Sequence, residues 1–353
     1  MKKFFLDSDI KEILDRIQND AIKFSNKTIL LTGGKGFLGR YIVEVFKKLN
    51  NEKLDEPAKL IVLDNLITAG DFGLESITDT NIKFIQHDVI KKIDIQEKID
   101  YVIHAAGIAS PQYYKDHPLE TLDISITGTK NMLELAKIND AKFIFFSSSE
   151  IYGDPTENNI PTTEEYRGNV STQGPRACYD EGKRTGETLC YIYHNYKNLK
   201  TTIVRPFNFY GPGMQEKDYR VLPNFASQIK NNKPLNVYGT GNQTRTYCYI
   251  TDAITGLFQA ILLGIPGETY NIGNPFPEVS VIELVKKISE SIKQEIQYNI
   301  IEHPSNYPSS EPNRRCPSIK KAQTEIQYDP IVDLNEGLKR FFSWTEENFT
   351  KIN

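Results

Sequence analysis

The stretch Thr28-Ile29-Leu30-Leu31-Thr32-Gly33-Gly34-Lys35-Gly36-Phe37-Leu38-Gly39 decides the fold class of this chain. It begins as a short aliphatic run, passes through glycines at positions 33, 36 and 39, and continues into a helical pattern over residues 38–49. Glycine permits a tight turn there and lacks the Cβ that would hold a pyrophosphate away from the backbone. The helix that follows presents free N–H groups and the positive end of its dipole to phosphates.

A carboxylate stands where the strand after this turn ends. Asp64 follows the apolar run 60–63. At this place an acidic side chain bonds the adenosine ribose hydroxyls and repels a 2′-phosphate. The sequence therefore predicts NAD rather than NADP, with a solvated turn aspartate as the alternative. Asp88, which follows the run 84–87, is a candidate adenine contact or an ordinary strand-end aspartate.

Apolar runs alternate with helical stretches through the first part of the chain. The runs cover residues 28–31, 60–63, 82–85, 101–104, 143–147 and 202–205, and helical patterns cover 38–49, 121–136 and 179–196. This alternation predicts an α/β fold, a Rossmann-type doubly wound parallel sheet with helices on both faces. After Pro206 the chain is punctuated by Pro and Gly, which favours a smaller C-terminal α/β substrate domain.

The domain boundaries follow from these patterns. We expect an N-terminal amphipathic helix within residues 1–26 and a cofactor domain over 27–206, to which 246–269 return. The substrate domain would then comprise 207–245 and 270–353. In the N-terminal helix, Ile10, Ile13, Leu14 and Ile17 form one apolar face. Asp9 and Glu12 resemble a capping pair at its start. We expect this helix to dock on the main domain, with partner binding as the alternative.

Composition excludes several classes of function. The formal net charge is −4 and the pI about 5.9, so no basic field invites nucleic acid. No apolar run reaches the roughly 18 residues of a membrane-spanning helix. Four cysteines lack CxxC pairing and metal-ligand spacing, and we interpret them as free thiols of a cytoplasmic protein without a metal. The expected partner is a small molecule.

Tyr179 and Lys183 have the i, i+4 spacing that puts two side chains on one face of a helix. A phenol with a pKa near 10 is a poor base at neutral pH, and a neighbouring ammonium favours the phenolate. Tyr179 would then take a hydroxyl proton while hydride leaves for NAD. Ser148, at the end of the run 143–147, would hold the reacting oxygen.

These features together resemble the extended short-chain dehydrogenase/reductase family, whose members bind NAD in the larger domain and a nucleotide sugar in the smaller one. Segments 165–170, 174–184, 205–212, 220–225 and 234–245 closely resemble UDP-glucuronate decarboxylases, and the resemblance covers roughly residues 27–344. By this resemblance Ser148, Tyr179 and Lys183 form the oxidoreduction triad. Ser149 and Glu150 match the pair that separates decarboxylases from dehydratases, and Arg315 matches an arginine near the sugar carboxylate.

The resemblance also implies the binding residues. The NAD site is expected to comprise Gly33, Gly36, Phe37, Leu38, Gly39, Asp64, Asn65, Asp88, Val89 and Ala105, together with Tyr179 and Lys183. The nucleotide-sugar site is expected to comprise Tyr114, Asn208, Arg220, Asn224, Val237, Tyr238, Gln243 and Arg245. A diphosphate suits the fork of an arginine, which favours Arg245 as a ligand over a loop residue. Family members usually form dimers through the helices at 121–136 and 179–196, so we expect a homodimer.

The reaction implied is decarboxylation of UDP-glucuronate. Oxidation at C4 would give a ketone β to the C6 carboxylate, carbon dioxide would leave, and Glu150 or a water would help to protonate C5. A dehydratase needs an acid at position 149, which Ser149 is not. Gln112, Ser125, Cys316 and the segment 171–173, which includes Thr172, depart from the family pattern. Alternatives are a 4-epimerase, a C4-oxidase of another nucleotide sugar, or a non-catalytic nucleotide-sugar binding protein.

Overall fold

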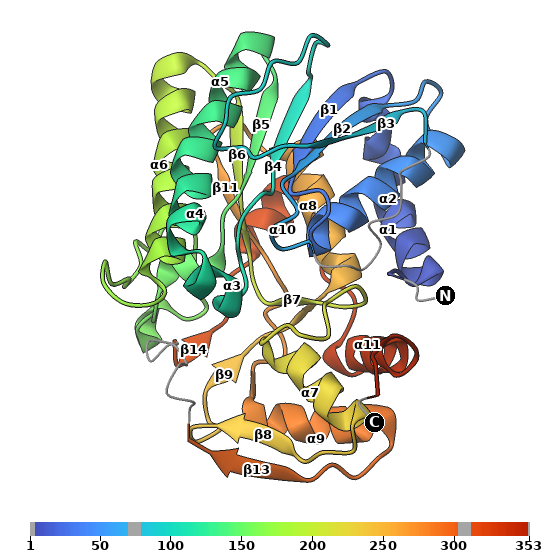
Figure 1. The fold of residues 1–353 in the computed structure, drawn as a ribbon, viewed down its shortest axis with the longest axis vertical. Helices are drawn as coiled ribbons and strands as arrows, with labels where there is room; N and C mark the ends of the chain where they lie inside the picture. The colour runs from blue at the N-terminus through green and yellow to red at the C-terminus, as the bar shows by residue number, and fades with distance from the viewer. Residues whose placement is uncertain (1–3, 70–78, 303–311, 352–353) are drawn as a thin grey trace.

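The computed structural model describes residues 4–69, 79–302 and 312–351. Within these residues the centre of the molecule is a seven-stranded parallel sheet in the order β11-β6-β5-β4-β1-β2-β3 (Figure 1). Its strands are β1 (Thr28–Thr32), β2 (Lys59–Asp64), β3 (Ile82–Gln86), β4 (Tyr101–His104), β5 (Lys142–Phe146), β6 (Thr201–Pro206) and β11 (Thr269–Ile272). The predicted parallel α/β sheet is therefore confirmed, with the six predicted runs in place and β11 added.

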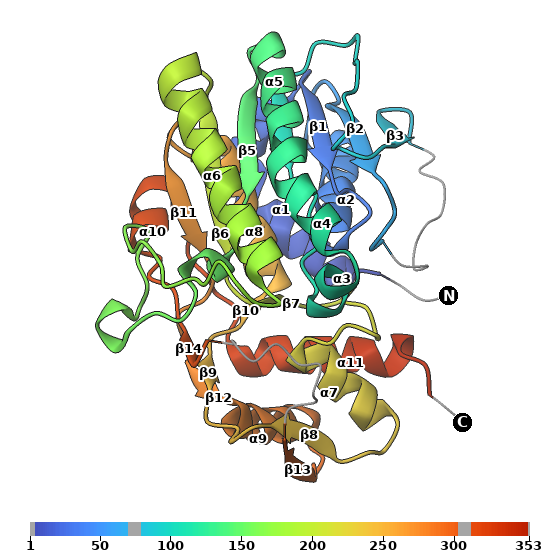
Figure 2. The same cartoon turned by 60° about the vertical axis from the view of Figure 1, so that its left-hand side comes forward.

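Helices cover both faces of the sheet. On one face lie α4 (Pro118–Asp123), α5 (Thr129–Asn139) and α6 (Ala177–Lys197), and on the other α1 (Asp7–Ala21), α2 (Phe37–Glu52) and α8 (Ile250–Leu263) (Figure 2). Alternate residues of β1 serve the two sides, since Leu30 belongs to one core cluster while Ile29 and Leu31 belong to the other. The near-continuous apolar strands are thus explained by burial on both faces.

The chain order reverses at β1, which pairs with β2 on one side and with β4 on the other. In open parallel sheets ligands bind outside the carboxyl ends of the strands at such a reversal. The glycine turn after β1 and the segment after β4 therefore face the same crevice. The helix expected over residues 121–136 is divided into α4, a π-helical turn η2 (Ile124–Gly128) and α5.

A second group of elements lies below this edge of the sheet (Figure 1). It contains the helices α7 (Val221–Lys230), α9 (Val281–Ile292) and α11 (Leu334–Asn348). It also contains three small sheets. β7 (Phe209–Tyr210) pairs with β10 (Cys248–Tyr249), and β8 (Leu235–Tyr238) pairs with β13 (Tyr298–Ile301). The third sheet consists of β9 (Thr244–Arg245), β12 (Val279–Ser280) and β14 (Arg314–Arg315). Two further short helices belong with the large sheet: α3 (Pro111–Asp116) contacts α4, and α10 (Lys320–Ile326) contacts α8 and β11. Strand β11 of the large sheet extends to Ile272, three residues beyond the predicted return segment 246–269. The predicted division into domains stays a prediction.

The N-terminal helix α1 packs against α8 and α2. Its predicted apolar face, Ile10, Ile13, Leu14 and Ile17, is buried there, so the prediction that the helix docks on the main body is confirmed. The predicted capping pair is wrong, because the helix begins at Asp7 with Leu6 as its N-cap. Asp9 instead accepts a hydrogen bond from the Tyr249 hydroxyl at 2.7 Å.

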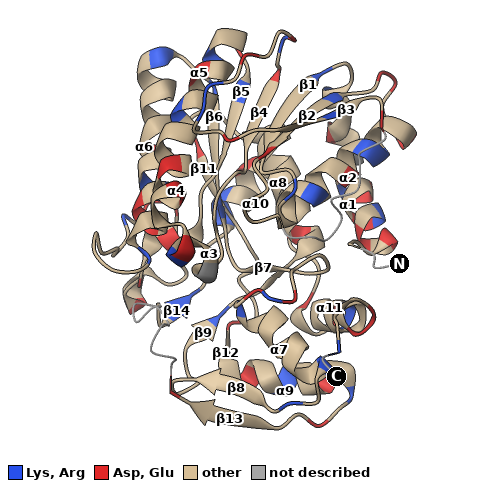
Figure 3. Ribbon diagram, viewed as in Figure 1, with Lys and Arg blue, Asp and Glu red and all other residues tan. Residues whose placement is uncertain are grey.

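Acidic and basic residues are interspersed over the molecule (Figure 3). Among the described residues, no helix is long and apolar enough to cross a lipid bilayer.

Candidate active site

The glycine turn after β1 forms one wall of a long cleft. Gly33 has a φ of +72°, and a Cβ on Gly39 would lie 2.2 Å from the Gly33 carbonyl oxygen, so neither position accepts a larger residue. α2 begins at Phe37, directly after this turn, and points its free N–H groups into the cleft. Asp64 lies next to the turn, where its carboxylate oxygens accept the backbone N–H groups of Lys35 and Leu66, both at 2.8 Å. This cradle without Cβ atoms and the oriented carboxylate fit the pyrophosphate and ribose of NAD.

Most of the expected cofactor residues lie along this cleft. The residues that line it include Gly33, Gly36, Phe37, Leu38, Gly39, Asp64, Asn65, Val89, Ala105, Tyr179 and Lys183. Asp88 is not among the lining residues, and its carboxylate accepts the N–H of Ile90 at 3.2 Å within its own turn. An adenine contact from Asp88 therefore gains no support from the structure.

Sequence reasoning missed several residues of this cleft, and three of them lie close together. Lys35, Arg40 and Phe4 line it near Asp64. Arg40 donates to the carbonyl oxygens of Lys35 at 2.6 Å and Ala69 at 3.2 Å, and burial lowers its pKa to about 10. Its guanidinium lies 4.9 Å from the centre of the Phe4 ring. No sequence signal placed Phe4 there, because it reaches the cleft only through the docking of α1.

Tyr179 and Lys183 project from the first two turns of α6 toward the cleft. Lys183 Nζ donates to the Phe146 carbonyl oxygen at 2.7 Å and lies 5.9 Å from the centre of the Tyr179 ring. Burial lowers the pKa of Lys183 to about 8. Burial likewise raises the pKa of Tyr179 to about 12, against a hydrogen bond with Ser148 that lowers it. The expected lowering of the Tyr179 pKa is therefore absent in this state, since loss of hydration outweighs the favourable contacts.

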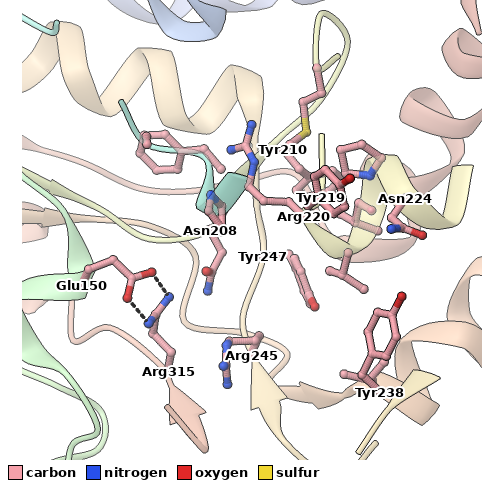
Figure 4. Close-up of a pocket in the computed structure, with 18 of the residues that line it drawn as sticks. Glu150, Asn208, Tyr210, Tyr219, Arg220, Asn224, Tyr238, Arg245, Tyr247 and Arg315 are labelled. Carbon is pink, nitrogen blue, oxygen red and sulfur yellow. Dashed lines mark hydrogen bonds and ion pairs between the residues drawn. The ribbon is translucent and has the colours of Figure 1, made fainter. Parts of the chain in front are cut away.

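Ser148, Ser149 and Glu150 follow β5 and enter the 3₁₀ turn η3 (Ser149–Tyr152). Ser148 caps this turn and accepts the N–H of Glu150 at 3.2 Å. Arg315, brought in by β14, donates to both carboxylate oxygens of Glu150, at 2.7 and 2.6 Å (Figure 4). Arg176 donates to the same carboxylate. Burial alone would raise the pKa of Glu150, but Arg315 and Arg176 together hold it at about 2.

A second cavity opens from this point toward the lower group of elements. Its lining includes Tyr114, Glu150, Arg176, Tyr179, Asn208, Arg220, Asn224, Tyr238, Gln243, Arg245 and Arg315. Glu150, Tyr179 and Arg315 line both cavities, which therefore meet at the catalytic candidates. Tyr114 stacks on Tyr179, with ring centres 5.7 Å apart.

Several residues expected to bind the nucleotide sugar already make contacts within the protein. Asn208 donates to the Thr246 carbonyl oxygen at 2.8 Å, and Asn224 accepts from Gln228 at 2.7 Å. Gln243 donates to the Tyr238 carbonyl oxygen at 3.3 Å. Val237 packs its side chain wholly into the core, so any contact it makes with a nucleotide would come from its backbone.

The two arginines expected to meet the diphosphate are held by different partners. The Arg220 guanidinium pairs with Asp218 and lies between the two cavities, both of which it lines. The Arg245 guanidinium donates to three carbonyl oxygens, those of Thr244, Asn313 and Pro312, at 2.8, 3.2 and 2.6 Å. Binding of a diphosphate by Arg245 would require some of these bonds to be shared.

The positions that depart from the family pattern lie mostly away from the cavities. Ser125 is buried in η2, where a Cβ on Gly182 would meet its hydroxyl at 3.2 Å, and it lines neither cavity. Thr172 is exposed, and Cys316 donates to the Pro275 carbonyl oxygen at 3.5 Å. The Gln112 side chain lies outside what the structure describes.

Sequence reasoning also missed residues of the second cavity. Arg176, Tyr219 and Tyr247 line it. The i, i+4 spacing of Arg176 and Asp180 is the one sequence feature that could have pointed to an ion pair, but only the direction of α6 places that pair beside Glu150. In the described part of the chain, no group of three or more His, Cys, Asp or Glu side chains is arranged to hold a metal ion.

Curated proteins of known name are similar to this chain in sequence. UDP-glucuronic acid decarboxylase 6 of Arabidopsis thaliana is 39% identical over 323 residues, which cover 91% of this chain and 90% of that protein. UDP-glucuronic acid decarboxylase 1 of Xenopus tropicalis is 36% identical and matches 89% of this chain and 71% of its own.

Solved structures of epimerases share the fold of this chain. An epimerase from Methanothermobacter thermautotrophicus superposes with a TM-score of 0.80 at 27% identity, covering 95% of this chain and 97% of its own. A UDP-glucuronic acid 4-epimerase from Bacillus cereus, in complex with NAD, gives 0.76 at 26% identity, covering 92% and 100%. The model of the NAD dependent epimerase/dehydratase family matches residues 29–273. The chain belongs to this family of extended short-chain dehydrogenases/reductases.

Proposed function

We propose that this protein catalyses the NAD-dependent decarboxylation of a UDP-hexuronate, with UDP-glucuronate as the substrate. The single observation that carries this proposal is the pairing of Arg176 and Arg315 around Glu150, beside Tyr179, where the two cavities meet. Two guanidinium groups at the reacting end of a sugar cavity suit a substrate that carries a carboxylate there. The names of the 36–39% identical relatives support the same substrate.

The first step would be removal of the C4 hydroxyl proton. NAD, when bound in the cleft, would accept the hydride from C4 and could return it later. Tyr179 would take the proton, helped by the Lys183 ammonium, while Ser148 holds the C4 oxygen. Burial raises the pKa of Tyr179 to about 12, and the hydrogen bond with Ser148 offsets only part of that rise, so the phenolate would depend on the further help of Lys183.

The second step would be loss of carbon dioxide. A C4 ketone is β to the C6 carboxylate, so the C5–C6 bond can break with its electron pair moving toward the C4 oxygen. Arg315 and Arg176 would hold the carboxylate in line with this movement. The low pKa of Glu150, set by its two arginines, makes it a poor proton donor to C5. We therefore assign Glu150 to the orientation of Arg315 and leave C5 protonation to water.

The absence of an acid at position 149 argues against a dehydratase. Ser149 is buried at the start of η3 and cannot protonate a leaving 6-hydroxyl at neutral pH. Return of hydride to C4 would give UDP-xylose, whereas early loss of the reduced cofactor would give a 4-keto pentose.

The test is to incubate the purified protein with NAD and UDP-glucuronate and to follow carbon dioxide and the sugar products by mass spectrometry. We expect the sugar to lose the mass of one carbon dioxide. An unchanged mass with inverted configuration at C4 would identify a 4-epimerase instead. An untouched sugar, with NAD bound, would contradict the proposal and direct the search to nucleotide sugars that lack a carboxylate.

We also propose a homodimer formed through the face of α4, α5 and α6. Large apolar side chains are exposed on these helices: Leu119, Ile138, Tyr191, Ile192 and Tyr196. Light scattering on the wild type and on Tyr196→Lys would test this, with a shift toward monomer expected for the variant. The four cysteines are free, which supports a cytoplasmic location.

A further inference from the structure

Four charged side chains form a buried cluster at the reacting end of the sugar cavity. Arg176 and Arg315 both bind Glu150, and Arg176 Nε lies 3.6 Å from a carboxylate oxygen of Asp180. Arg176, Asp180 and Arg315 are each only 7% exposed. The cluster therefore holds two guanidinium groups and two carboxyl groups, largely removed from water.

Hydrogen bonding within this cluster is incomplete. The second carboxyl oxygen of Asp180, Nε of Arg315 and the hydroxyl of Tyr114 are buried without a hydrogen-bond partner among the residues that the structure describes. Burial of a polar atom without a partner is costly, so such atoms mark places where a proton or a ligand is expected. Protonation of Asp180 removes the negative charge of this incompletely bonded, buried carboxylate, and burial of a charge costs more than burial of a neutral carboxyl group.

The charge of the cluster depends on Asp180. Glu150 stays ionised, because its pKa is about 2. Burial and the Glu150 charge raise the pKa of Asp180 to about 7, against Arg176 and Arg315, which lower it. With Asp180 protonated the cluster carries one net positive charge, and with Asp180 ionised it carries none. Only the protonated form offers an incoming carboxylate a net opposite charge.

We propose that Asp180 takes up a proton when the carboxylate of a hexuronate binds beside Arg176 and Arg315, and thereby sets the preference of the cavity for a carboxylate-bearing sugar. This inference rests on the proposed function, since it assumes a UDP-hexuronate substrate. Asp180 does not line the cavity and acts through Arg176, so it is a positioning residue.

Of the groups around Asp180 that are named here, all but Lys183 keep one protonation state near pH 7 to 8. Tyr114 from α3 and Cys178 of α6 have pKa values raised by burial, and burial raises that of Tyr179 to about 12. Glu150 comes from η3 and Arg315 from β14, and both stay charged. Lys183, further along α6, has its pKa lowered by burial to about 8 and is the one group among these that would compete with Asp180 in taking up a proton. A variant of Asp180 distinguishes proton uptake by Asp180 from proton uptake by Lys183.

The sign of the effect follows from linkage. A bound carboxylate repels the ionised form of Asp180 and raises its pKa further. Below about pH 7 Asp180 already holds its proton, so binding takes up none. Above that pH each bound hexuronate takes up one proton, and its affinity falls by about tenfold per pH unit. A sugar without a carboxylate shows neither effect.

The experiment uses the NAD-loaded Tyr179→Phe protein, in which turnover is blocked, and the double variant that also carries Asp180→Asn. Calorimetric titration at pH 8 in two buffers of different ionisation enthalpy gives the protons taken up with UDP-glucuronate and with UDP-xylose. We expect close to one proton for UDP-glucuronate with Asp180 present and none for UDP-xylose. In the Asp180→Asn double variant we expect no uptake and a Kd for UDP-glucuronate that does not change between pH 6.5 and 8.5.

Equal uptake with and without Asp180 would overturn the proposal and implicate Lys183, and so would absence of uptake in the protein that keeps Asp180. Retained NAD and unchanged UDP-xylose affinity serve as the folding control for Asp180→Asn. If that variant does not fold, the ratio of the two Kd values against pH in the Asp180 protein decides, because a flat ratio overturns the proposal. If the wild-type protein releases carbon dioxide but the ratio of the two Kd values does not change with pH, the role of Asp180 is refuted and the proposed function stands. Failure to bind UDP-glucuronate would refute the proposed function as well.

Discussion

Arg315 and Glu150, separated by 165 positions in the chain, form a two-pronged ion pair at 2.7 and 2.6 Å where the cofactor cleft meets the sugar cavity. Glu150 lies in the 3₁₀ turn η3, which follows β5 of the large sheet, while Arg315 comes from β14 in the lower group of elements. The pair therefore ties the two parts of the molecule together at the place where chemistry is proposed.

The first prediction concerns the fork of Arg315. Arg315→Lys keeps a positive charge but loses the two parallel N–H bonds, so we expect decarboxylation to slow by on the order of a hundredfold or more. The measurement is kcat for carbon dioxide release, with NAD content and UDP-xylose affinity as checks on folding. Arg314→Lys is the matched control, because Arg314 pairs with Glu278 and lines neither cavity. Equal losses in the two variants would remove the special role of Arg315.

The second prediction concerns the pH dependence of turnover. Burial lowers the pKa of Lys183 to about 8, while the charge of Glu187 raises it. If the ammonium form assists Tyr179, kcat at saturating UDP-glucuronate falls as the pH rises through about 8, and saturation removes the effect of Asp180 on binding. Glu187→Gln removes the opposing charge, so this falling limb should move to lower pH. A limb that stays in place in the variant, or a rate that holds well above that pH, would contradict the assignment.

The third prediction concerns the choice of cofactor. Asp64→Ser removes a carboxylate from the ribose end of the cleft, and a hydrogen bond to a charged group is worth about 1.5–3 kcal/mol. We expect NAD to bind at least about tenfold more weakly and the preference over NADP to shrink. Fluorescence titration of the cofactor-free protein measures both. Asp88→Asn should lose less, because its carboxylate is engaged within its own turn. Equal wild-type affinity for NAD and NADP would show that Asp64 does not select the cofactor.

The fourth prediction concerns the docking of α1. Ile13 is fully buried against the main body, so Ile13→Ala should cost about 2–5 kcal/mol of unfolding free energy. Lys11, two positions earlier, is exposed, and Lys11→Ala should change stability by less than about 0.5 kcal/mol. Denaturant unfolding of both variants measures this difference. Similar stability of the two would mean that α1 contributes little to the fold.

Local sequence patterns determined the sheet, the cofactor cleft and the oxidoreduction pair. Strand periodicity, the glycine turn at 33–39, Asp64 at a strand end and the Tyr179–Lys183 spacing each depend on residues that are neighbours in the chain or in one helix. For these the geometry of a strand or a helix already fixes which side chains lie together. The family resemblance then supplied Glu150 and Arg315.

Only the tertiary structure decided the environment of those groups. Asp9 looked like a cap and proved to be the buried partner of Tyr249, 240 positions away. Burial raised the pKa of Tyr179, where the sequence suggested a lowered value. The cluster of Arg176, Asp180, Glu150 and Arg315 exists only because α6, η3 and β14 converge. Loss of hydration and long-range charge depend on what packs around a side chain, and no local pattern contains that information.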